Sequence, residues 1–273
     1  MKLKDATLLQ NSFGINRFVQ NFSVNIMTKT NSTDWFETWF DTSYYHTLYK
    51  HRDTDEAESF ISNLIEYLKL KDGSKCLDLA CGKGRHSLFL NKNGFDVTGL
   101  DLSINSIESA KSMENDTLKF DVHDMREVYQ DEKFDAIFNL FTSFGYFDSN
   151  EDNLKVLYSV HKMLKDDGIF IIDFMNAKKS INSLVESEMK EIDGINFKIK
   201  RSFDGKHIHK NIQFEDESQD FEFNERVQAL FKEDFERLLN KSGFRIEQLF
   251  GDFELNPFDE SISKRLIIIA KKA

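Results

Sequence analysis

Short apolar segments alternate with stretches of helical spacing through the middle of the chain, and this alternation constrains the fold more than any other feature. The apolar segments are residues 75–79, 96–100, 117–121, 134–140 and 168–174. The helical stretches between them are residues 85–93, 104–113 and 151–164. Strands joined by helices form a parallel sheet, because a parallel connection needs a long crossover. The pattern therefore predicts a doubly wound α/β fold.

Further elements are predicted on both sides of this core. Aromatic residues three and four apart predict an amphipathic helix, or a helix and a turn, at residues 34–50, and a second helix is expected at 54–70. Asp166-Asp167-Gly168 predicts a turn before the fifth strand. The end of the chain returns to the α/β pattern, with a helix at 232–241 and strands at 244–250 and 265–270.

Between residues 176 and 230 the pattern changes to that of antiparallel strands. The segments FKIKRSF and HIHKNIQF flank Asp204-Gly205, a pair typical of a hairpin turn, and residues 221–230 alternate as a third strand. The acidic run at 215–220 is expected to be a solvated loop. The sequence thus predicts an antiparallel β cap inserted into the α/β core.

The length of 273 residues suits one α/β domain with an insertion. The expected division is an N-terminal extension of poor order at 1–30, helices and α/β core at 31–175, the β cap at 176–230 and the rest of the core at 231–273. The 27 phenylalanines predict a core built on aromatic packing.

Charge and cysteine content exclude several classes of protein. A net charge of −11 argues against sequence-independent binding of nucleic acid, which depends on clustered Lys and Arg. The two cysteines, Cys76 and Cys81, are about 16 Å apart along an extended chain and should not form a disulfide, which suits the cytoplasm. No apolar stretch approaches the roughly 20 residues of a membrane span. We expect a cytoplasmic protein with no membrane partner.

The segment CLDLACGKGRHSLFL, residues 76–90, carries the clearest functional signal. A buried strand ends near Asp78, and the turn after it contains Gly82 and Gly84, which let the backbone approach a ligand closely. The helix that follows directs its N-terminal amides at the same space and favours negative charge there. A nicotinamide-binding fold also has such a turn, so the turn alone does not decide the function.

Three residues distinguish this segment from a dinucleotide site. Ser87 stands where the dinucleotide motif has its third glycine. Asp78 precedes the first glycine by four positions, where a carboxylate suits an ammonium group better than a pyrophosphate. Asp101 ends the second strand, in a position to accept hydrogen bonds from ribose hydroxyls. Together they favour a nucleoside ligand that carries an amino acid.

These features resemble those of class I S-adenosylmethionine-dependent methyltransferases of the small-molecule type. The resemblance spans residues 35–270 and is strongest at 76–84. It implies a Rossmann-like, seven-stranded, mostly parallel sheet whose last strand is antiparallel, S-adenosylmethionine as cofactor and a small-molecule acceptor. The cofactor residues that it implies are Asp78, Ala80, Gly82 and Gly84 for the methionine part, Asp101 for the ribose, Leu102, Asp124 and Met125 for the adenine, and Asn139, Leu140 and Phe141 at the end of the fourth strand. Residues 144–147 are expected near the acceptor.

The run YYHTLYKHR, residues 44–52, is similar to a helix that covers the cofactor in some members of the family. This similarity places Tyr45 or Tyr49, and Arg52, near the methionine carboxylate or the acceptor, although Arg52 equally suits a solvated surface. A dedicated base is optional, because a sulfonium is already a good leaving group and alignment is the main task. The candidate catalytic residues are Tyr45, His46, His51 and Tyr146, each of which also suits packing.

Two other functions remain compatible with the sequence. A nicotinamide-dependent oxidoreductase shares the sheet and the ribose-binding acid, and a non-catalytic module could bind S-adenosylmethionine without transferring its methyl group. His207 and His209 lie two residues apart on a predicted strand and so on one face, a spacing that suits a metal ion. No nearby cysteine or third histidine supports one, so we expect an exposed strand face and no metal.

Overall fold

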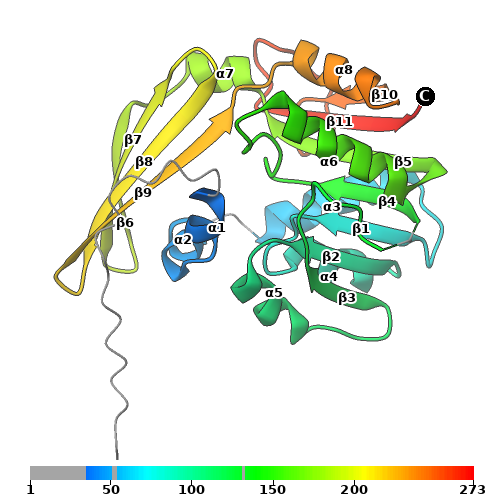
Figure 1. Ribbon diagram of the computed structural model, residues 1–273, viewed down its shortest axis with the longest axis horizontal. Coiled ribbons are helices and arrows are strands. Elements are labelled where there is room, and N and C mark those ends of the chain that lie inside the picture. Colours follow the sequence, from blue (N-terminus) through cyan, green and yellow to red (C-terminus); the bar gives the residue numbers. More distant parts are fainter. Residues whose placement is uncertain (1–34, 51–53, 131–132) are drawn as a thin grey trace, which may run out of the picture. The chain divides into compact units, whose positions relative to one another are not determined.

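The larger of the two sheets has seven strands (Figure 1, right half). The structure is a computed structural model, and it describes residues 35–50, 54–130 and 133–273. The strand order is β10-β11-β5-β4-β1-β2-β3. The strands are β1 (Lys75–Leu79), β2 (Asp96–Asp101), β3 (Leu118–Val122), β4 (Phe134–Asn139), β5 (Leu164–Met175), β10 (Phe244–Phe250) and β11 (Arg265–Lys272).

Within this sheet only β11 runs against its neighbours. It pairs antiparallel with both β5 and β10, whereas the other neighbouring strands pair in parallel. The predicted seven-stranded, mostly parallel sheet and its antiparallel last strand are confirmed. The expected extension at residues 1–30 lies outside the described residues, all of which belong to the unit Thr33–Ala273.

Helices cover both faces of the sheet, as the doubly wound pattern predicts. One hydrophobic cluster joins the sheet to α3 (Thr54–Leu68), α4 (Arg85–Lys92) and α5 (Ile104–Lys111). The other cluster joins it to α6 (Asn150–Met163) and α8 (Lys232–Lys241). Along β11 the side chains alternate between the two clusters, because successive residues of a strand point to opposite faces. In the part of the chain that the structure describes, no helix is long and apolar enough to span a membrane.

The expected turn at Asp166-Asp167-Gly168 is wrong, because these residues lie inside β5. The strand pairs with β4 through Phe134 and Leu164, shifts register, and continues through Ala136 and Ile169. Gly168 permits this irregular course: a Cβ there would lie only 2.7 Å from Leu164 Cγ. The turn signal in the sequence marks a bulge, where extra residues on one strand bend it without ending the pairing.

A second, antiparallel sheet contains four strands in the order β6-β7-β8-β9. They are β6 (Ser187–Ile192), β7 (Ile195–Phe203), β8 (His207–Asp216) and β9 (Gln219–Gln228), preceded by α7 (Ala177–Asn182). The predicted hairpin and third strand are present. The sequence reading missed β6 and α7, because β6 has the sequence SEMKEI and buries only its last residue.

The acidic run at residues 215–220 is largely exposed, as expected, but the expected loop is wrong except for a two-residue turn. β8 continues to Asp216 and β9 begins at Gln219, so only Glu217 and Ser218 form the turn, with φ values of 48° and 62°. Asp216 accepts a hydrogen bond of 2.8 Å from the Tyr44 hydroxyl. A strand with one solvated face carries charged residues there, and the sequence reading took that polarity for a loop.

The N-terminal aromatic segment forms two short helices, α1 (Trp35–Phe40) and α2 (Ser43–Leu48). The Thr42 hydroxyl caps α2 by accepting a hydrogen bond of 3.1 Å from the Tyr45 amide. Both helices lie beside the second sheet (Figure 1), where the rings of Trp39 and Phe223 are 4.4 Å apart. Aromatic packing thus joins the start of the described chain to the insertion.

A buried ion pair joins β5 to β11. The Asp173 side chain is fully buried, and its Oδ1 accepts a hydrogen bond of 2.7 Å from Arg265 Nε. The other oxygen, Oδ2, accepts a hydrogen bond of 2.8 Å from the Phe141 amide, just after β4. Phe141 and Thr142 both have positive φ, at 56° and 64°. The ion pair therefore also fixes a strained loop at the end of β4.

Arg265→Met should lower the free energy of unfolding by about 3–5 kcal/mol, because it leaves the buried Asp173 charge without a partner. Urea denaturation near neutral pH measures the change. The double variant Asp173→Asn with Arg265→Met should recover part of the loss, since it buries no charge. Equal stability of Arg265→Met and the wild type would contradict this role of the pair.

Candidate functional site

A cavity of about 460 Å³ opens at the carboxyl ends of β1, β2, β3 and β4. This is the edge where ligands bind in open α/β sheets, and the volume falls in the range of small-molecule sites, about 300–1,000 Å³. Its floor is formed by residues 80–83, 101–103 and 123–125, together with Leu140 and Phe141. The opposite wall comes from α1, α2 and the residue that follows α2, and it contains Phe36, Phe40, Tyr45, His46 and Tyr49.

Most of the predicted site residues line this cavity. They are Tyr45, His46, Asp78, Ala80, Gly82, Asp101, Leu102, Asp124, Met125, Leu140, Phe141, Tyr146 and Phe147. Gly84, Asn139 and Phe144 are not among the lining residues. His51 and Arg52 lie outside the described residues.

The two glycines of the turn after β1 have different roles. Gly82 has a φ of 55°, and a Cβ placed on it would meet nothing within 4 Å, so its backbone is open to the cavity. Gly84 has a φ of 77°, and a Cβ there would lie 2.5 Å from the Phe120 ring. Gly99 on β2 meets the same ring at 2.6 Å, a requirement that the sequence reading missed. Gly82 can therefore contact a ligand, whereas Gly84 and Gly99 allow Phe120 to pack beneath the turn.

Asp78 is buried at the end of β1 and is held by the first helix after the turn. Its Oδ2 accepts a hydrogen bond of 2.6 Å from the Ser87 hydroxyl. Burial raises the pKa of Asp78 to about 6, and the Ser87 hydrogen bond opposes this increase. Ser87, read from the sequence only as a missing glycine, is thus the partner that orients the carboxylate.

Asp101 connects the ends of β1 and β2. Its Oδ2 accepts a hydrogen bond of 2.8 Å from the Gly82 amide, and its Oδ1 accepts one of 2.8 Å from the Ser103 amide. Burial raises the pKa of Asp101, while the amides of Ser103 and Gly82 partly offset that increase. Each carboxylate oxygen can accept a further hydrogen bond, so the side chain can still bind hydroxyl groups in the cavity.

Asp124, after β3, is paired with its neighbour Arg126. The Arg126 Nε atom lies 2.9 Å from Asp124 Oδ2, and the Arg126 amide lies 2.9 Å from Oδ1. Burial alone would raise the pKa of Asp124, but the hydrogen bonds from Arg126 outweigh burial and lower the pKa. Asp124 is therefore an oriented hydrogen-bond acceptor at the end of the cavity next to Met125.

Asn139 supports the cavity without lining it. Its Nδ2 donates a hydrogen bond of 3.0 Å to the Leu79 carbonyl, so it joins the ends of β4 and β1. Beyond it, the Phe141 ring stacks on His86 at a centroid distance of 4.8 Å and an interplanar angle of 19°. Both rings line the cavity, and His86 belongs to the helix that opens after the glycine turn.

Aromatic rings dominate the wall opposite the glycine turn. Phe40 lies 4.8 Å from Tyr45 and 5.2 Å from Tyr146, and Tyr45 lies 4.8 Å from Tyr49, between ring centroids. The Tyr49 hydroxyl donates a hydrogen bond of 2.7 Å to Glu225 Oε1 on β9. The second sheet therefore orients part of the cavity wall.

His46 lines the same wall and is neutral at physiological pH. Burial lowers the pKa of His46 to about 4, the nearby Lys83 adds to this decrease and Asp41 opposes it. A neutral imidazole can accept a hydrogen bond from a ligand. The low pKa makes it a weak proton acceptor, so it suits orientation of a ligand better than permanent capture of a proton.

Asp41, between α1 and α2, attaches these helices to the core and was missed by the sequence reading. Its Oδ1 accepts hydrogen bonds from the Ser103 hydroxyl, at 2.5 Å, and from the Asn105 amide, at 3.1 Å. Both partners lie at the start of α5, next to Asp101. The only signal in the sequence was the Asp41-Thr42 pair, which is typical of a helix start.

Comparison with known proteins gives a family model described as a methyltransferase domain, which matches residues 70–239, more than half of the chain. A glycine/sarcosine N-methyltransferase of Aphanothece halophytica is 31% identical over 229 residues, covering 80% of this chain and 81% of that protein. A dTDP-3-amino-3,4,6-trideoxy-alpha-D-glucopyranose N,N-dimethyltransferase of Streptomyces venezuelae is 29% identical over 133 residues, covering 47% of this chain and 54% of that protein.

A solved S-adenosylmethionine-dependent methyltransferase from Clostridium acetobutylicum shares the fold, with a TM-score of 0.72 at 21% identity. The match covers 84% of this chain and 96% of that one. The comparisons give no support to a nicotinamide-dependent oxidoreductase or to a non-catalytic module. The chain belongs to the methyltransferase domain family and is a class I S-adenosylmethionine-dependent methyltransferase.

Proposed function

We propose that this enzyme transfers a methyl group from S-adenosylmethionine to the amine nitrogen of a small molecule. The observation that carries this proposal is the composition of the cavity described above, where carboxylates at the strand ends face a wall of aromatic rings and a neutral histidine. The two curated relatives described above are named as N-methyltransferases, one of glycine and sarcosine and one of an amino sugar nucleotide.

The strand ends offer the groups that S-adenosylmethionine requires. The open backbone at Gly82 suits the methionine part, Asp78 suits its ammonium group, and Asp101 retains acceptor positions for the ribose hydroxyls. Leu102 and Met125 supply apolar surface for the adenine, with Asp124 as acceptor for its amino group. When bound, the cofactor supplies a methyl group on a positively charged sulfur.

Two of the predicted cofactor contacts, Gly84 and Asn139, do not line the cavity. Gly84 makes room for Phe120, and Asn139 ties β4 to β1, so we assign them to the support of the site. Ala80, with a φ of 65°, and Leu140 line the cavity and remain proposed cofactor contacts. Arg52 stays a prediction, because it lies outside the described residues.

The acceptor would lie against the aromatic wall. Rings attract cations through their faces, so Phe40, Tyr45 and Tyr146 suit an amine that gains positive charge as its nitrogen is methylated. His46 is neutral and can accept a hydrogen bond from the amine, which orients the nitrogen lone pair. We propose that α1, α2 and the inserted sheet, within residues 176–230, close this side and exclude water.

Purified enzyme with methyl-labelled S-adenosylmethionine should label amines and not their hydroxyl analogues. Glycine, sarcosine and amino sugars can be compared with glycolate and the matching unaminated sugars, with mass spectrometry of the product. A reaction without acceptor gives the background. Transfer to oxygen or sulfur acceptors alone would overturn the proposal of an amine acceptor.

Asp101→Ala should weaken binding of S-adenosylhomocysteine by about 1–3 kcal/mol, because it removes charged acceptors for the ribose hydroxyls and frees the Gly82 amide. Isothermal titration calorimetry measures the affinity. Asp96→Ala, at the opposite end of the same strand, is the matched control and should bind normally. Unchanged affinity in Asp101→Ala would remove Asp101 from the site.

Binding of S-adenosylhomocysteine should strengthen as pH rises between about pH 5 and pH 7, because the ligand's ammonium group prefers the ionised form of Asp78. The raised pKa of Asp78, about 6, means that the folded protein favours the protonated carboxyl. The free energy of unfolding should therefore be higher at low pH and fall by about 3 kcal/mol as pH rises through that pKa. Asp78→Asn should therefore show a smaller rise in affinity, and a smaller loss of stability with rising pH. Identical pH profiles for both proteins would contradict the assignment.

A further inference from the structure

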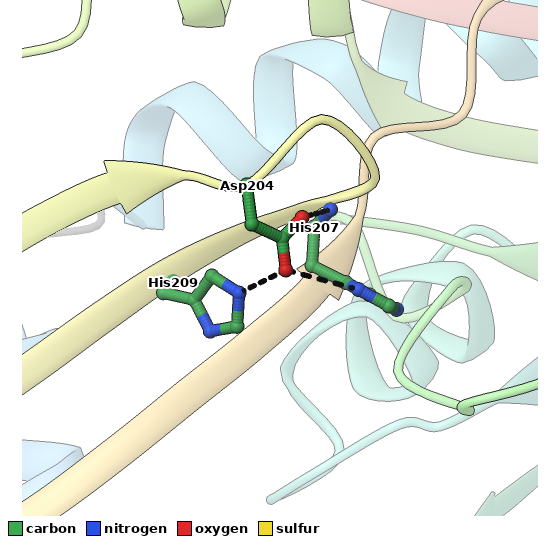
Figure 2. Close-up of side chains that lie close together, drawn as sticks. All are labelled: Asp204, His207 and His209. Atoms are coloured by element: carbon green, nitrogen blue, oxygen red, sulfur yellow. Dashed lines mark hydrogen bonds and ion pairs between the residues drawn. The ribbon is translucent and has the colours of Figure 1, made fainter.

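Three metal-ligand side chains meet at the turn between β7 and β8, outside the cofactor cavity. Asp204, His207 and His209 each offer one ligand atom, and these atoms all lie within 4.8 Å of one another. Figure 2 shows the Asp204 carboxylate between the two imidazoles. None of the three residues lines the cavity.

The backbone of the hairpin produces this arrangement. His207 and His209 are two residues apart on β8, so their side chains share one face of the strand. Asp204 begins the turn, and its Oδ1 accepts hydrogen bonds from the amides of Lys206, at 2.8 Å, and His207, at 2.6 Å. These bonds direct Oδ2 to the histidines, 2.7 Å from His209 Nε2 and 3.7 Å from His207 Nδ1.

His207 is buried without a strong polar partner. Its Nε2 atom is buried and has no hydrogen-bond partner, and its Nδ1 lies beyond hydrogen-bond distance of Asp204. A cation at Nδ1 would satisfy the nitrogen that faces the carboxylate, with the ring proton on Nε2. Nδ1 is therefore the nitrogen on the side of the cluster, near the Asp204 carboxylate but not hydrogen-bonded to it.

We propose that Asp204 Oδ2, His207 Nδ1 and His209 Nε2 bind a divalent transition metal ion, with Zn²⁺ as the best match. Imidazole and carboxylate ligands suit zinc, and three protein ligands leave the fourth tetrahedral position to water. Zinc–ligand bonds of about 2.0–2.1 Å require ligand atoms about 3.3 Å apart. The present separations from Asp204 Oδ2 are 3.7 Å to His207 Nδ1 and 2.7 Å to His209 Nε2, so binding would require small rotations of Asp204 and His209, which are 46% and 39% exposed.

Neighbouring charges do not prevent this binding. Burial lowers the pKa of His207, and the positive charges of Lys206 and Arg226 lower it further. Arg226 is paired with the Asp148 carboxylate, and Lys206 donates a hydrogen bond of 3.1 Å to the Asp148 carbonyl. The Asp204 carboxylate then remains available to balance part of the charge of the ion.

The site would stabilise one wall of the cavity from outside. Lys206, in the same turn, is bonded to Asp148, and the Gln228 side chain opposite His207 donates a hydrogen bond of 2.9 Å to the Phe147 carbonyl. Tyr146 and Phe147 in that loop line the cavity. An ion at the turn would hold β7 and β8 in place where they meet this loop, so we assign it a structural role.

Untagged protein, stripped with a chelator, should bind one Zn²⁺ ion per chain in isothermal titration calorimetry. His209→Ala and Asp204→Asn should each weaken binding at least tenfold. Asn at position 204 keeps the acceptor that holds the turn, so this variant should fold normally. His161→Gln, on α6 and outside both the cavity and the cluster, is the matched control and should bind like the wild type.

Nitrogen-15 NMR of labelled histidines gives a second readout. Zinc should shift the imidazole signals of His207 and His209 and leave that of His161 unchanged. Absence of binding by the wild type, equal affinity in all four proteins, or shifts confined to other histidines would each overturn the proposal. These outcomes do not depend on methyl transfer, so the metal site and the proposed amine acceptor are tested separately.

Discussion

The carboxylate of Asp101 is the interaction on which the site depends. It accepts hydrogen bonds from the Gly82 amide on one side and the Ser103 amide on the other, so one side chain fixes the turn after β1 and the start of α5. Ser103 in turn contacts Asp41, which attaches the N-terminal helices. The floor and the aromatic wall of the cavity are therefore positioned by the same chain of hydrogen bonds.

The close packing of the Phe120 ring against the backbone of two glycines supports this arrangement. Phe120 fills the space over Gly84 and Gly99, where any Cβ would be within 2.6 Å of its ring. The packing brings α4 against β1 and β2 and lets Ser87 reach Asp78. A dinucleotide fold obtains its close helix-to-strand contact from a third glycine. Here Gly99 on the neighbouring strand β2 allows the close contact. Position 87 therefore carries a serine, whose hydroxyl orients the Asp78 carboxylate.

The cap depends on aromatic and charged contacts between segments far apart in the chain. Trp39 and Tyr49 both donate hydrogen bonds to Glu225, and the Trp39 ring packs on Phe223. A second contact lies next to the turn with Asp204. There the Gln228 side chain, opposite His207 in the sheet, donates a hydrogen bond to the Phe147 carbonyl. The inserted sheet thus supports the proposed acceptor wall at two places.

The sequence by itself determined the central sheet, the glycine turn and the acids at three strand ends, because local periodicity and parallel-strand topology place strand ends at one edge. It also indicated the family. It missed β6, whose single buried residue leaves almost no apolar pattern, and it mistook a bulge at Gly168 for a turn. Only the tertiary structure separated Gly82, which faces the cavity, from Gly84 and Asn139, which support it. Only the structure brought Asp204 to His207 and His209, since a contact across a turn depends on where the backbone directs each side chain.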